Sequence, residues 1–293
     1  MPKYDTTVDT TSENTSHSVM LELVGGHKNV LDVGCATGYL GEVLRARGCI
    51  VTGVELDREA AEIASSKLGR LVVGDIVTLD LVETFGPERF DVVVLGDVIE
   101  HVVDPAGLLA RVATLLVPGG SVVISTPNVA HGALRLALLQ GRWRYRDLGL
   151  LDRTHLRFFT RESLESVVRE AGLVAVDVRT TRRDALDTEV EIDVAGLPAG
   201  LVEWVRAQPD AEVYQFVLRA VRDDGAAVPD VLRAERDDLR RRLSDVQALN
   251  VDLAAQRDAA QRDLETMRAT RGWRAVERMR LLVRGRRQAG SVR

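Results

Sequence analysis

The sequence is poor in the residues that build small cross-linked or membrane-embedded proteins. It has two cysteines, 4% aromatic residues and 8 prolines among 293 residues. Cys35 and Cys49 have neither the number of a disulfide framework nor the spacing of metal ligands, so we expect two reduced packing residues. The apolar runs are short and interrupted by charge, and the first 18 residues are mostly polar. We therefore expect neither a signal peptide nor a membrane span, and a cytoplasmic protein.

Charge is divided unevenly along the chain. The net charge is −5, but residues 268–293 hold nine arginines and one acidic residue, which leaves −13 for the first 267 residues. An acidic body argues against nucleic acid as a substrate or partner. The hydrophobic content of 45% is sufficient for a sizeable core, and the length suits one or two domains.

A glycine turn between two apolar runs is the most informative local pattern. The segment VLDVGCATG, residues 30–38, predicts a strand and a tight turn, with a helix beginning at about Tyr39. Glycine lets a ligand approach the backbone closely, and a helix N-terminus offers unpaired N–H groups. Glu55 ends the next apolar run, where a carboxylate can accept hydrogen bonds from ribose hydroxyls. The unit predicts a site for a nucleoside-bearing cofactor.

The glycine spacing narrows the choice of cofactor. Glycines 34, 38 and 41 do not follow G-x-G-x-x-G, so a dinucleotide is poorly supported. The strings DVGCATG, VELD, GDI, DVIEH and PGG instead resemble the motifs of class I S-adenosylmethionine-dependent methyltransferases, in the same order. The resemblance covers residues 16–222 and is strongest to the small-molecule group that includes quinone O-methyltransferases. Ala36 stands where that family usually has glycine, and we expect it to keep the turn with a negative φ.

The resemblance implies S-adenosylmethionine as the cofactor and assigns most of its site. Asp32 would organise the turn and its contacts to the methionine part, Asp75 would meet the adenine amino group, and Ile76 would cover the ring. The stretch from Asp97 would line the pocket. The expected cofactor-binding residues are Asp32, Gly34, Cys35, Ala36, Thr37, Gly38, Tyr39, Glu55, Leu56, Asp75, Ile76, Gly96, Asp97 and Val98.

Histidines are the candidates for catalysis. Methyl transfer is an in-line displacement that needs acceptor and methyl group held close together, and a histidine base assists a hydroxyl acceptor. His101, after the fourth expected strand, is either this base or a packing residue at the start of a helix expected over 104–116. His155 is either the base or a structural residue, and His131 could also face the acceptor. No group of carboxylates and histidines has metal-site spacing, so we expect no metal.

The order of apolar runs predicts the architecture of the main domain. Short runs rich in β-branched residues alternate with amphipathic segments, which indicates a doubly wound α/β fold with a mostly parallel, seven-stranded sheet. The resemblance implies that the last strand is antiparallel. Strands are expected at 29–33, 50–54, 71–73, 90–95, 121–125, 174–179 and 213–221.

Two insertions interrupt the predicted methyltransferase domain, which follows a polar arm at 1–15 and covers 16–223. The segment 128–159 holds much of the aromatic content and forms either a lid over an acceptor pocket or a helical subdomain. The segment 180–212 is expected to be a loop with a short helix, and its role is unassigned.

Beyond a linker at 224–230 the composition changes. Apolar residues recur every seven positions, with one asparagine in the seam, which predicts an α-helical coiled coil over 231–270. It would form a parallel homodimer or bind a partner protein, and a single solvated helix is the alternative. The basic tail at 271–293 suits peripheral contact with an anionic membrane, a disordered end or an acidic partner.

Two functions follow from these patterns. The first is methylation of a hydroxyl group on a small molecule, sugar or glycan. The string GDVI after the fourth strand, in place of the (Asn/Asp)-Pro-Pro-aromatic motif of many N-methyltransferases, favours an oxygen acceptor. The tail resembles segments of bacterial glycan-assembly proteins, and this resemblance is the reason for including a saccharide among the expected acceptors. The second is a non-catalytic cofactor-binding scaffold that the coiled coil dimerises.

Overall fold

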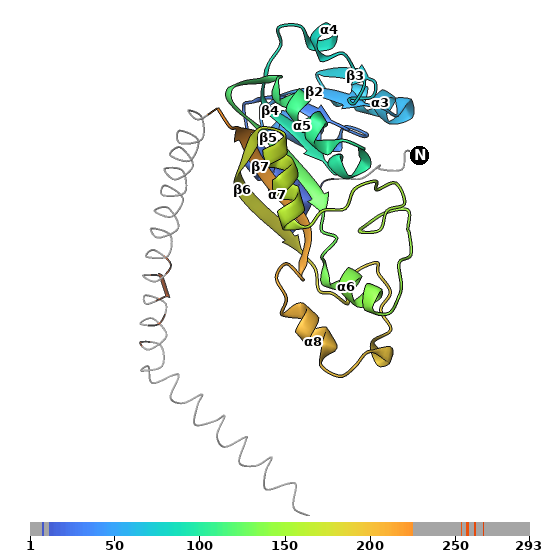
Figure 1. The fold of residues 1–293 in the computed structure, drawn as a ribbon. Coiled ribbons are helices and arrows are strands. Elements are labelled where there is room, and N and C mark those ends of the chain that lie inside the picture. Colours follow the sequence, from blue (N-terminus) through green and yellow to red (C-terminus); the bar gives the residue numbers. More distant parts are fainter. Residues whose placement is uncertain are drawn as a thin grey trace, which may run out of the picture. The chain divides into compact units, whose positions relative to one another are not determined.

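A computed structural model describes Val8 and residues 12–224, with isolated positions between 253 and 266. The main domain is a seven-stranded sheet in the order β3-β2-β1-β4-β5-β7-β6 (Figure 1). Its strands are β1 (Asn29–Val33), β2 (Ile50–Glu55), β3 (Arg70–Val73), β4 (Phe90–Gly96), β5 (Leu116–Pro127), β6 (Leu173–Arg182) and β7 (Val213–Arg222).

The sheet is mixed because one strand runs against the others. β1 pairs in parallel with β2 and β4, and β4 pairs in parallel with β5. β7 lies between β5 and β6 and is antiparallel to both. The seven expected strands and the antiparallel last strand are confirmed. β5 and β6 are longer than expected, so the second insertion begins after Arg182 rather than at 180.

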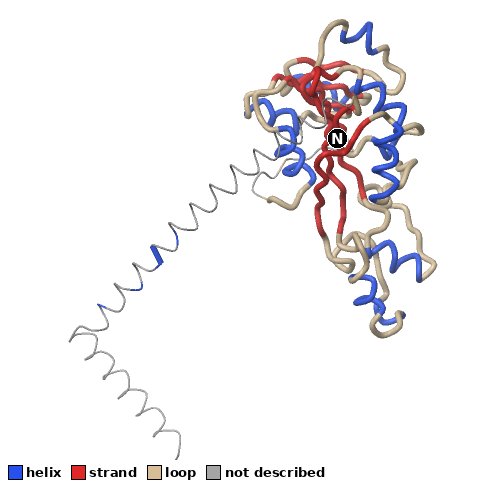
Figure 2. The backbone as a smooth tube through the Cα atoms, turned by 60° about the vertical axis from the view of Figure 1, so that its left-hand side comes forward, coloured by secondary structure: helices blue, strands red, loops and turns tan. Residues whose placement is uncertain are grey.

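Helices cover both faces of the sheet, as Figure 2 shows. The helices are α1 (Ser16–Val24), α2 (Tyr39–Ala46), α3 (Arg58–Ser65), α4 (Leu81–Phe85), α5 (Pro105–Ala113), α6 (Gly132–Leu139), α7 (Arg161–Glu170) and α8 (Leu201–Arg206), with short 3-10 helices η1 (Ile99–His101) and η2 (Val194–Gly196). α2 begins at Tyr39, as predicted.

Side chains alternate along the buried strands and divide the core in two. In β4, Val92 and Val94 pack in the cluster that includes α1, α2 and α3. Val93 and Leu95 point the other way, into the cluster that includes α4, α5 and α7. A strand buried on both faces needs apolar residues at consecutive positions, which explains the continuous run FDVVVLG.

The helix after β4 is shorter than expected. We predicted it over 104–116, but α5 ends at Ala113 because Leu116 already belongs to β5. Asp104 is its N-cap and accepts a hydrogen bond from the Gly107 N–H, and proline follows at the first helical position. His101 lies in the separate helix η1, so it does not cap this helix.

The two insertions lie beyond the strand ends. α6, from the segment 128–159, packs on α8, from the second insertion, and Figure 1 shows the two helices together at the lower end of the domain. The second insertion is largely loop with α8 and η2, as expected. No helix among the described residues is long and apolar enough to cross a membrane.

The chain divides into two units, 1–232 and 233–293. Of the predicted polar arm only Val8 and residues 12–15 are described, and the predicted linker, coiled coil and basic tail lie almost wholly outside the described residues. Leu253, Gln256, Arg257, Gln261 and Thr266 are described there, and all five are helical and exposed.

The packing of α5 on the sheet gives a test of the fold. Leu109 is fully buried between α5 and the strands, so Leu109→Ala leaves a cavity and we expect a loss of about 2–5 kcal/mol of unfolding free energy. Val103→Ala, at a residue that is 70% exposed, is the control. Equal urea midpoints for the two variants would contradict this assignment of the core.

Candidate active site

The glycine turn joins β1 to α2 at the carboxyl edge of the sheet. Gly34 has φ +68°, and a Cβ there would lie 2.8 Å from the Cγ2 atom of Val98. Gly38 has φ +76°. Gly34 therefore requires glycine because its φ is left-handed and Val98 approaches it closely. Gly38 requires glycine because its φ is left-handed.

Ala36 corrects one expectation. Its φ is +47°, not negative, so it occupies the left-handed region that usually favours glycine. The Glu55 carboxylate supports this conformation, because its Oε2 atom accepts a hydrogen bond of 2.8 Å from the Ala36 N–H. The turn keeps its shape in spite of the methyl group because a charged acceptor holds the peptide in place.

Glu55 lies at the end of β2, as the ribose assignment requires. Its second oxygen, Oε1, accepts a hydrogen bond of 2.8 Å from the Asp57 N–H. Each carboxylate oxygen can accept two hydrogen bonds, so both keep capacity for a ligand hydroxyl. Leu56, the next residue, is 65% exposed, which leaves an apolar side chain beside this carboxylate.

Asp32 is a strongly perturbed group beside the turn. It is buried on β1, and its Oδ2 atom has no hydrogen-bond partner. Desolvation and the nearby Glu55 charge raise its pKa to about 7. An unpartnered buried acceptor is costly unless a donor satisfies it. The ammonium group of a methionine part supplies such a donor, so these residues fit the expected cofactor.

A hollow lies where these elements meet. It is bounded by residues of α1, of the glycine turn with α2, and of the end of β4, namely His17, Met20, Asp32, Gly34, Cys35, Tyr39, Leu40, Gly96 and Asp97. His17 and Met20 were not among the predicted residues. The ring centroids of His17 and Tyr39 lie 5.1 Å apart, edge to face, and burial lowers the pKa of His17.

Asp97 is fixed by two side chains that the sequence did not indicate. Its φ is +54°, and its Oδ1 atom accepts hydrogen bonds from the Ser125 hydroxyl (3.0 Å) and the Gln215 amide (2.8 Å). Burial raises its pKa. The carboxylate is thus held at the end of β4 by β5 and β7 together.

The remaining predicted cofactor residues lie around this hollow or farther along the edge. Asp75 follows β3, and its Oδ1 atom accepts a hydrogen bond from the Val77 N–H. Ile76 is buried in the core cluster that includes α4, α5 and α7. Thr37 and Cys35 are buried in the turn, and burial raises the pKa of the Cys35 thiol. Cys35 and Cys49 are both free, as expected. The adenine contacts of Asp75 and Ile76 stay predictions.

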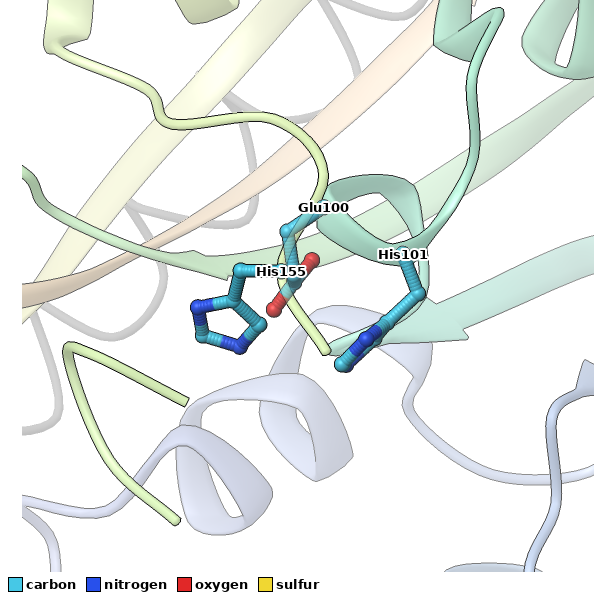
Figure 3. Close-up of side chains that lie close together, drawn as sticks. All are labelled: Glu100, His101 and His155. Atoms are coloured by element: carbon cyan, nitrogen blue, oxygen red, sulfur yellow. The ribbon is translucent and has the colours of Figure 1, made fainter. Parts of the chain in front are cut away.

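The two predicted catalytic histidines come together. The ring centroids of His101, in η1, and His155, in the first insertion, lie 4.9 Å apart (Figure 3). The Nδ1 atom of His101 bonds to the Thr154 carbonyl oxygen at 3.2 Å. Backbone contacts hold the two segments together, since the Leu156 and Arg157 N–H groups both donate to the Glu100 carbonyl oxygen.

Glu100 is a site residue that we did not predict. Its side chain is 1% exposed, Oε2 accepts a hydrogen bond from the Thr126 hydroxyl, and Oε1 has no partner. Burial, reinforced by the charge of Asp97, raises its pKa well above the usual range. With His101 and His155 it offers one carboxylate oxygen and two ring nitrogens within 4.8 Å of one another. The expectation of no metal rested on sequence spacing, and the fold assembles a set that could hold one.

His131 has a structural place instead of the acceptor role that we considered. It is fully buried as the N-cap of α6. Its Nδ1 atom accepts from the Ala133 N–H and its Nε2 atom bonds to the Arg183 carbonyl oxygen. Burial lowers its pKa.

The aromatic side chains of the first insertion have different surroundings. Trp143 and Phe158 pack edge to face, with centroids 5.5 Å apart. Phe159 belongs to the core cluster that includes α4, α5 and α7, and Tyr145 is 56% exposed. His155 and Phe158 are 6.2 Å apart, so the insertion brings aromatic surface beside the histidine pair. Both the lid and the subdomain interpretations agree with this arrangement.

The raised pKa of Asp32 gives a test by pH. The folded carboxyl binds its proton more tightly than the unfolded one, since its pKa rises from 3.8 to about 7. Unfolding free energy must therefore fall as pH rises through this window. Asp32→Asn removes the effect, so we expect the variant to gain about 2–3 kcal/mol on the wild type between about pH 5 and about pH 8.

Urea unfolding at both pH values measures this gain. Asp187→Asn, at an exposed carboxylate, is the control and should follow the wild type. An Asp32→Asn curve parallel to the wild type would exclude a buried, strained carboxyl.

Comparisons with known proteins identify the family of the domain. A family model described as a methyltransferase domain matches residues 17–178. The ubiquinone biosynthesis O-methyltransferase of Nitrosomonas europaea is 34% identical over 158 residues, which are 52% of this chain and 67% of that protein. The enzyme of the same name from Burkholderia pseudomallei is 31% identical over 57% of this chain and 75% of its own length.

Solved structures show the same fold. A SAM-dependent methyltransferase from Archaeoglobus fulgidus has a TM-score of 0.50 and 16% identity, covering 72% of this chain and 96% of that chain. A Bacillus halodurans protein has a TM-score of 0.51 and 16% identity over 71% of this chain and 98% of its own. Since the family model alone spans more than half of the sequence, the protein belongs to the class I S-adenosylmethionine-dependent methyltransferases.

Proposed function

We propose that this enzyme transfers a methyl group from S-adenosylmethionine to a hydroxyl group of a small-molecule acceptor, of the phenol, quinol or saccharide class. The observation that carries the proposal is the pair His101 and His155. His101 follows soon after Asp97, which borders the hollow at the end of β4, and His155 lies beside His101. The two imidazoles therefore stand next to the place where the cofactor would bind.

The similarity to named enzymes supports an oxygen acceptor. The relatives from Nitrosomonas europaea and Burkholderia pseudomallei carry the name ubiquinone biosynthesis O-methyltransferase. Family membership also makes the non-catalytic scaffold the weaker alternative. The acceptor of this chain is proposed by class alone, because neither insertion carries a transferable motif.

The acidic residues of the site and Ile76 would bind different parts of the cofactor. Asp32 and Asp97 bind the charged methionine end, and Glu55 binds the ribose while it holds the turn. Asp75 and Ile76 bind the adenine. Bound S-adenosylmethionine supplies an activated methyl group, and the protein's task is to align an acceptor oxygen with it and exclude water. The aromatic residues of the first insertion would form the wall around the acceptor.

The catalytic assignment is tested with His155→Ala and a screen of acceptors. Labelled S-adenosylmethionine is incubated with sugar nucleotides, quinols and phenols, and transferred label identifies the acceptor. With that acceptor we expect His155→Ala to lower kcat about 100-fold or more, since a positioned proton acceptor contributes this much. Cofactor affinity, measured by calorimetry, should stay within twofold of the wild type, roughly the experimental spread.

His27→Asn is the matched control, because His27 is exposed and lies outside the site. Wild-type turnover in His155→Ala would leave proximity as the sole catalytic device. Failure of the wild type to bind S-adenosylmethionine would overturn the proposed function as a whole.

We also propose, from the sequence pattern, that 231–270 joins two copies of the chain in a parallel coiled coil and that the tail at 271–293 contacts an anionic membrane from the cytoplasm. These segments lie outside the described residues, apart from the isolated positions named above. We expect light scattering to give a dimer for the full chain and a monomer for a chain ending at Asp230. A monomer in both cases would exclude the coiled-coil dimer.

A further inference from the structure

His17 lies at the border of the hollow, on a helix that is firmly attached to the sheet. Just before the helix, the Asn14 side chain exchanges two hydrogen bonds of 2.8 Å with the Arg182 backbone of β6. Farther along, Glu22 forms an ion pair of 2.6 Å with Arg179, which also belongs to β6. The fold therefore holds the imidazole in place, as a ligand-binding side chain requires.

The hollow has an excess of negative charge for the ligand that it is expected to hold. Asp32 and Asp97 both line it, and the charge of Glu55 is close enough to raise the pKa of Asp32. The methionine part of S-adenosylmethionine carries an ammonium group, a sulfonium and a carboxylate. The acidic side chains suit the cationic groups and repel the carboxylate. Among the described residues that line the hollow, His17 is the one basic side chain that could balance it.

Most main-chain donors of the glycine turn are already used. Four N–H groups, those of residues 34–36 and of Gly38, donate to oxygens of Val54, Glu55 and Cys35. The first N–H groups of α2 remain, since an α-helix gives them no partner of its own.

His17 stands beside the beginning of α2. Its ring meets the ring of Tyr39, the first residue of that helix, edge to face, with the centroids 5.1 Å apart. A helix N-terminus carries a partial positive charge, and an imidazolium adds a full charge and an N–H donor. The two together form a suitable site for one carboxylate.

The surroundings of His17 favour a neutral ring while the site is empty. Burial lowers its pKa, and the nearby charge of Asp97 raises it by less. The other titratable groups that line the hollow are Asp32, Cys35 and Tyr39, and burial raises the pKa of each. An entering carboxylate favours the charged ring, so the histidine would bind a proton together with the cofactor.

We propose that His17 binds the carboxylate of the cofactor's methionine part as an imidazolium, which forms when S-adenosylmethionine enters the hollow. The inference rests on the proposed function and specifies how its cofactor is selected. No covalent bond of the cofactor changes, because a proton passes from solvent to the ring and the resulting N–H donates to the carboxylate. Affinity then falls as pH rises from the pKa of the empty-site ring to its pKa in the complex.

Asp32 has the opposite effect on binding. An ammonium group favours its ionised form, so the cofactor displaces a proton wherever Asp32 is still protonated, below its pKa of about 7. Measurements above about pH 7, on variants of His17 alone, therefore isolate the contribution of the imidazole.

The test compares His17→Gln, which keeps an N–H donor without the charge, with His17→Arg, which is charged at every pH. Calorimetry of S-adenosylmethionine binding to the full-length protein, in two buffers of different ionisation enthalpy, counts the protons taken up. At about pH 7.5 we expect the wild type to take up more protons than His17→Gln, by a few tenths per cofactor. His17→Gln should bind about tenfold more weakly, because it loses a charge-assisted hydrogen bond.

The pH dependence of affinity gives a second readout. Between about pH 7 and about pH 9 the wild type should lose affinity, whereas His17→Arg should keep a constant affinity. His27→Gln, at an exposed histidine outside the hollow, is the matched control and should follow the wild type.

A cofactor without its carboxylate separates the possible failures. Decarboxylated S-adenosylmethionine lacks the group that His17 would bind, so the wild type and His17→Gln should bind it equally, which also shows that the variant is folded. Equal proton uptake in these two proteins, or an equal preference for the complete cofactor over the decarboxylated one, would overturn the role of His17. Failure of the wild type to bind either cofactor would overturn the proposed function itself.

Discussion

The close approach of two turns at the carboxyl edge of the sheet is the constraint on which the site depends. Gly34, after β1, lies so near Val98, after β4, that a Cβ atom would clash at 2.8 Å. The missing side chain lets the two turns meet, and their meeting places Asp32 and Asp97 on the border of one hollow. Burial there raises the pKa of both carboxyls. Burying these two carboxyls costs folding stability, and a bound cationic ligand would reduce that cost.

Much of this arrangement could be predicted from the sequence, because parallel strands bring their carboxyl ends to one edge. Once the apolar runs were assigned to strands, Asp32, Glu55 and Asp97 had to lie at one edge of the sheet. The structure shows Asp32 close to the charge of Glu55 and on the same hollow as Asp97. Gln215 could not be found in this way. It lies near the start of β7, and only the antiparallel direction of that strand brings its beginning to the same edge, where Gln215 pairs with Pro127.

Other residues escaped prediction because they depend on tertiary packing. His17 and Met20 line the hollow since α1 packs back on the sheet, and no local motif encodes that return. Glu100 and His155 are far apart in the sequence, so ligand spacing could not reveal the cluster. The expectation of a negative φ for Ala36 was wrong for a related reason. A carboxylate from another strand stabilises its left-handed conformation.

The attachment of the first insertion has a consequence for evolution. Two peptide N–H groups, of Leu156 and Arg157, donate to the Glu100 carbonyl oxygen, so part of this connection is made by main-chain groups alone. Main-chain hydrogen bonds do not depend on the identity of the side chains beside them. Substitutions in the first insertion can therefore change its side chains while these hydrogen bonds keep His155 beside His101. The surface that this insertion presents can thus diverge in evolution while its attachment beyond the end of β4 is kept.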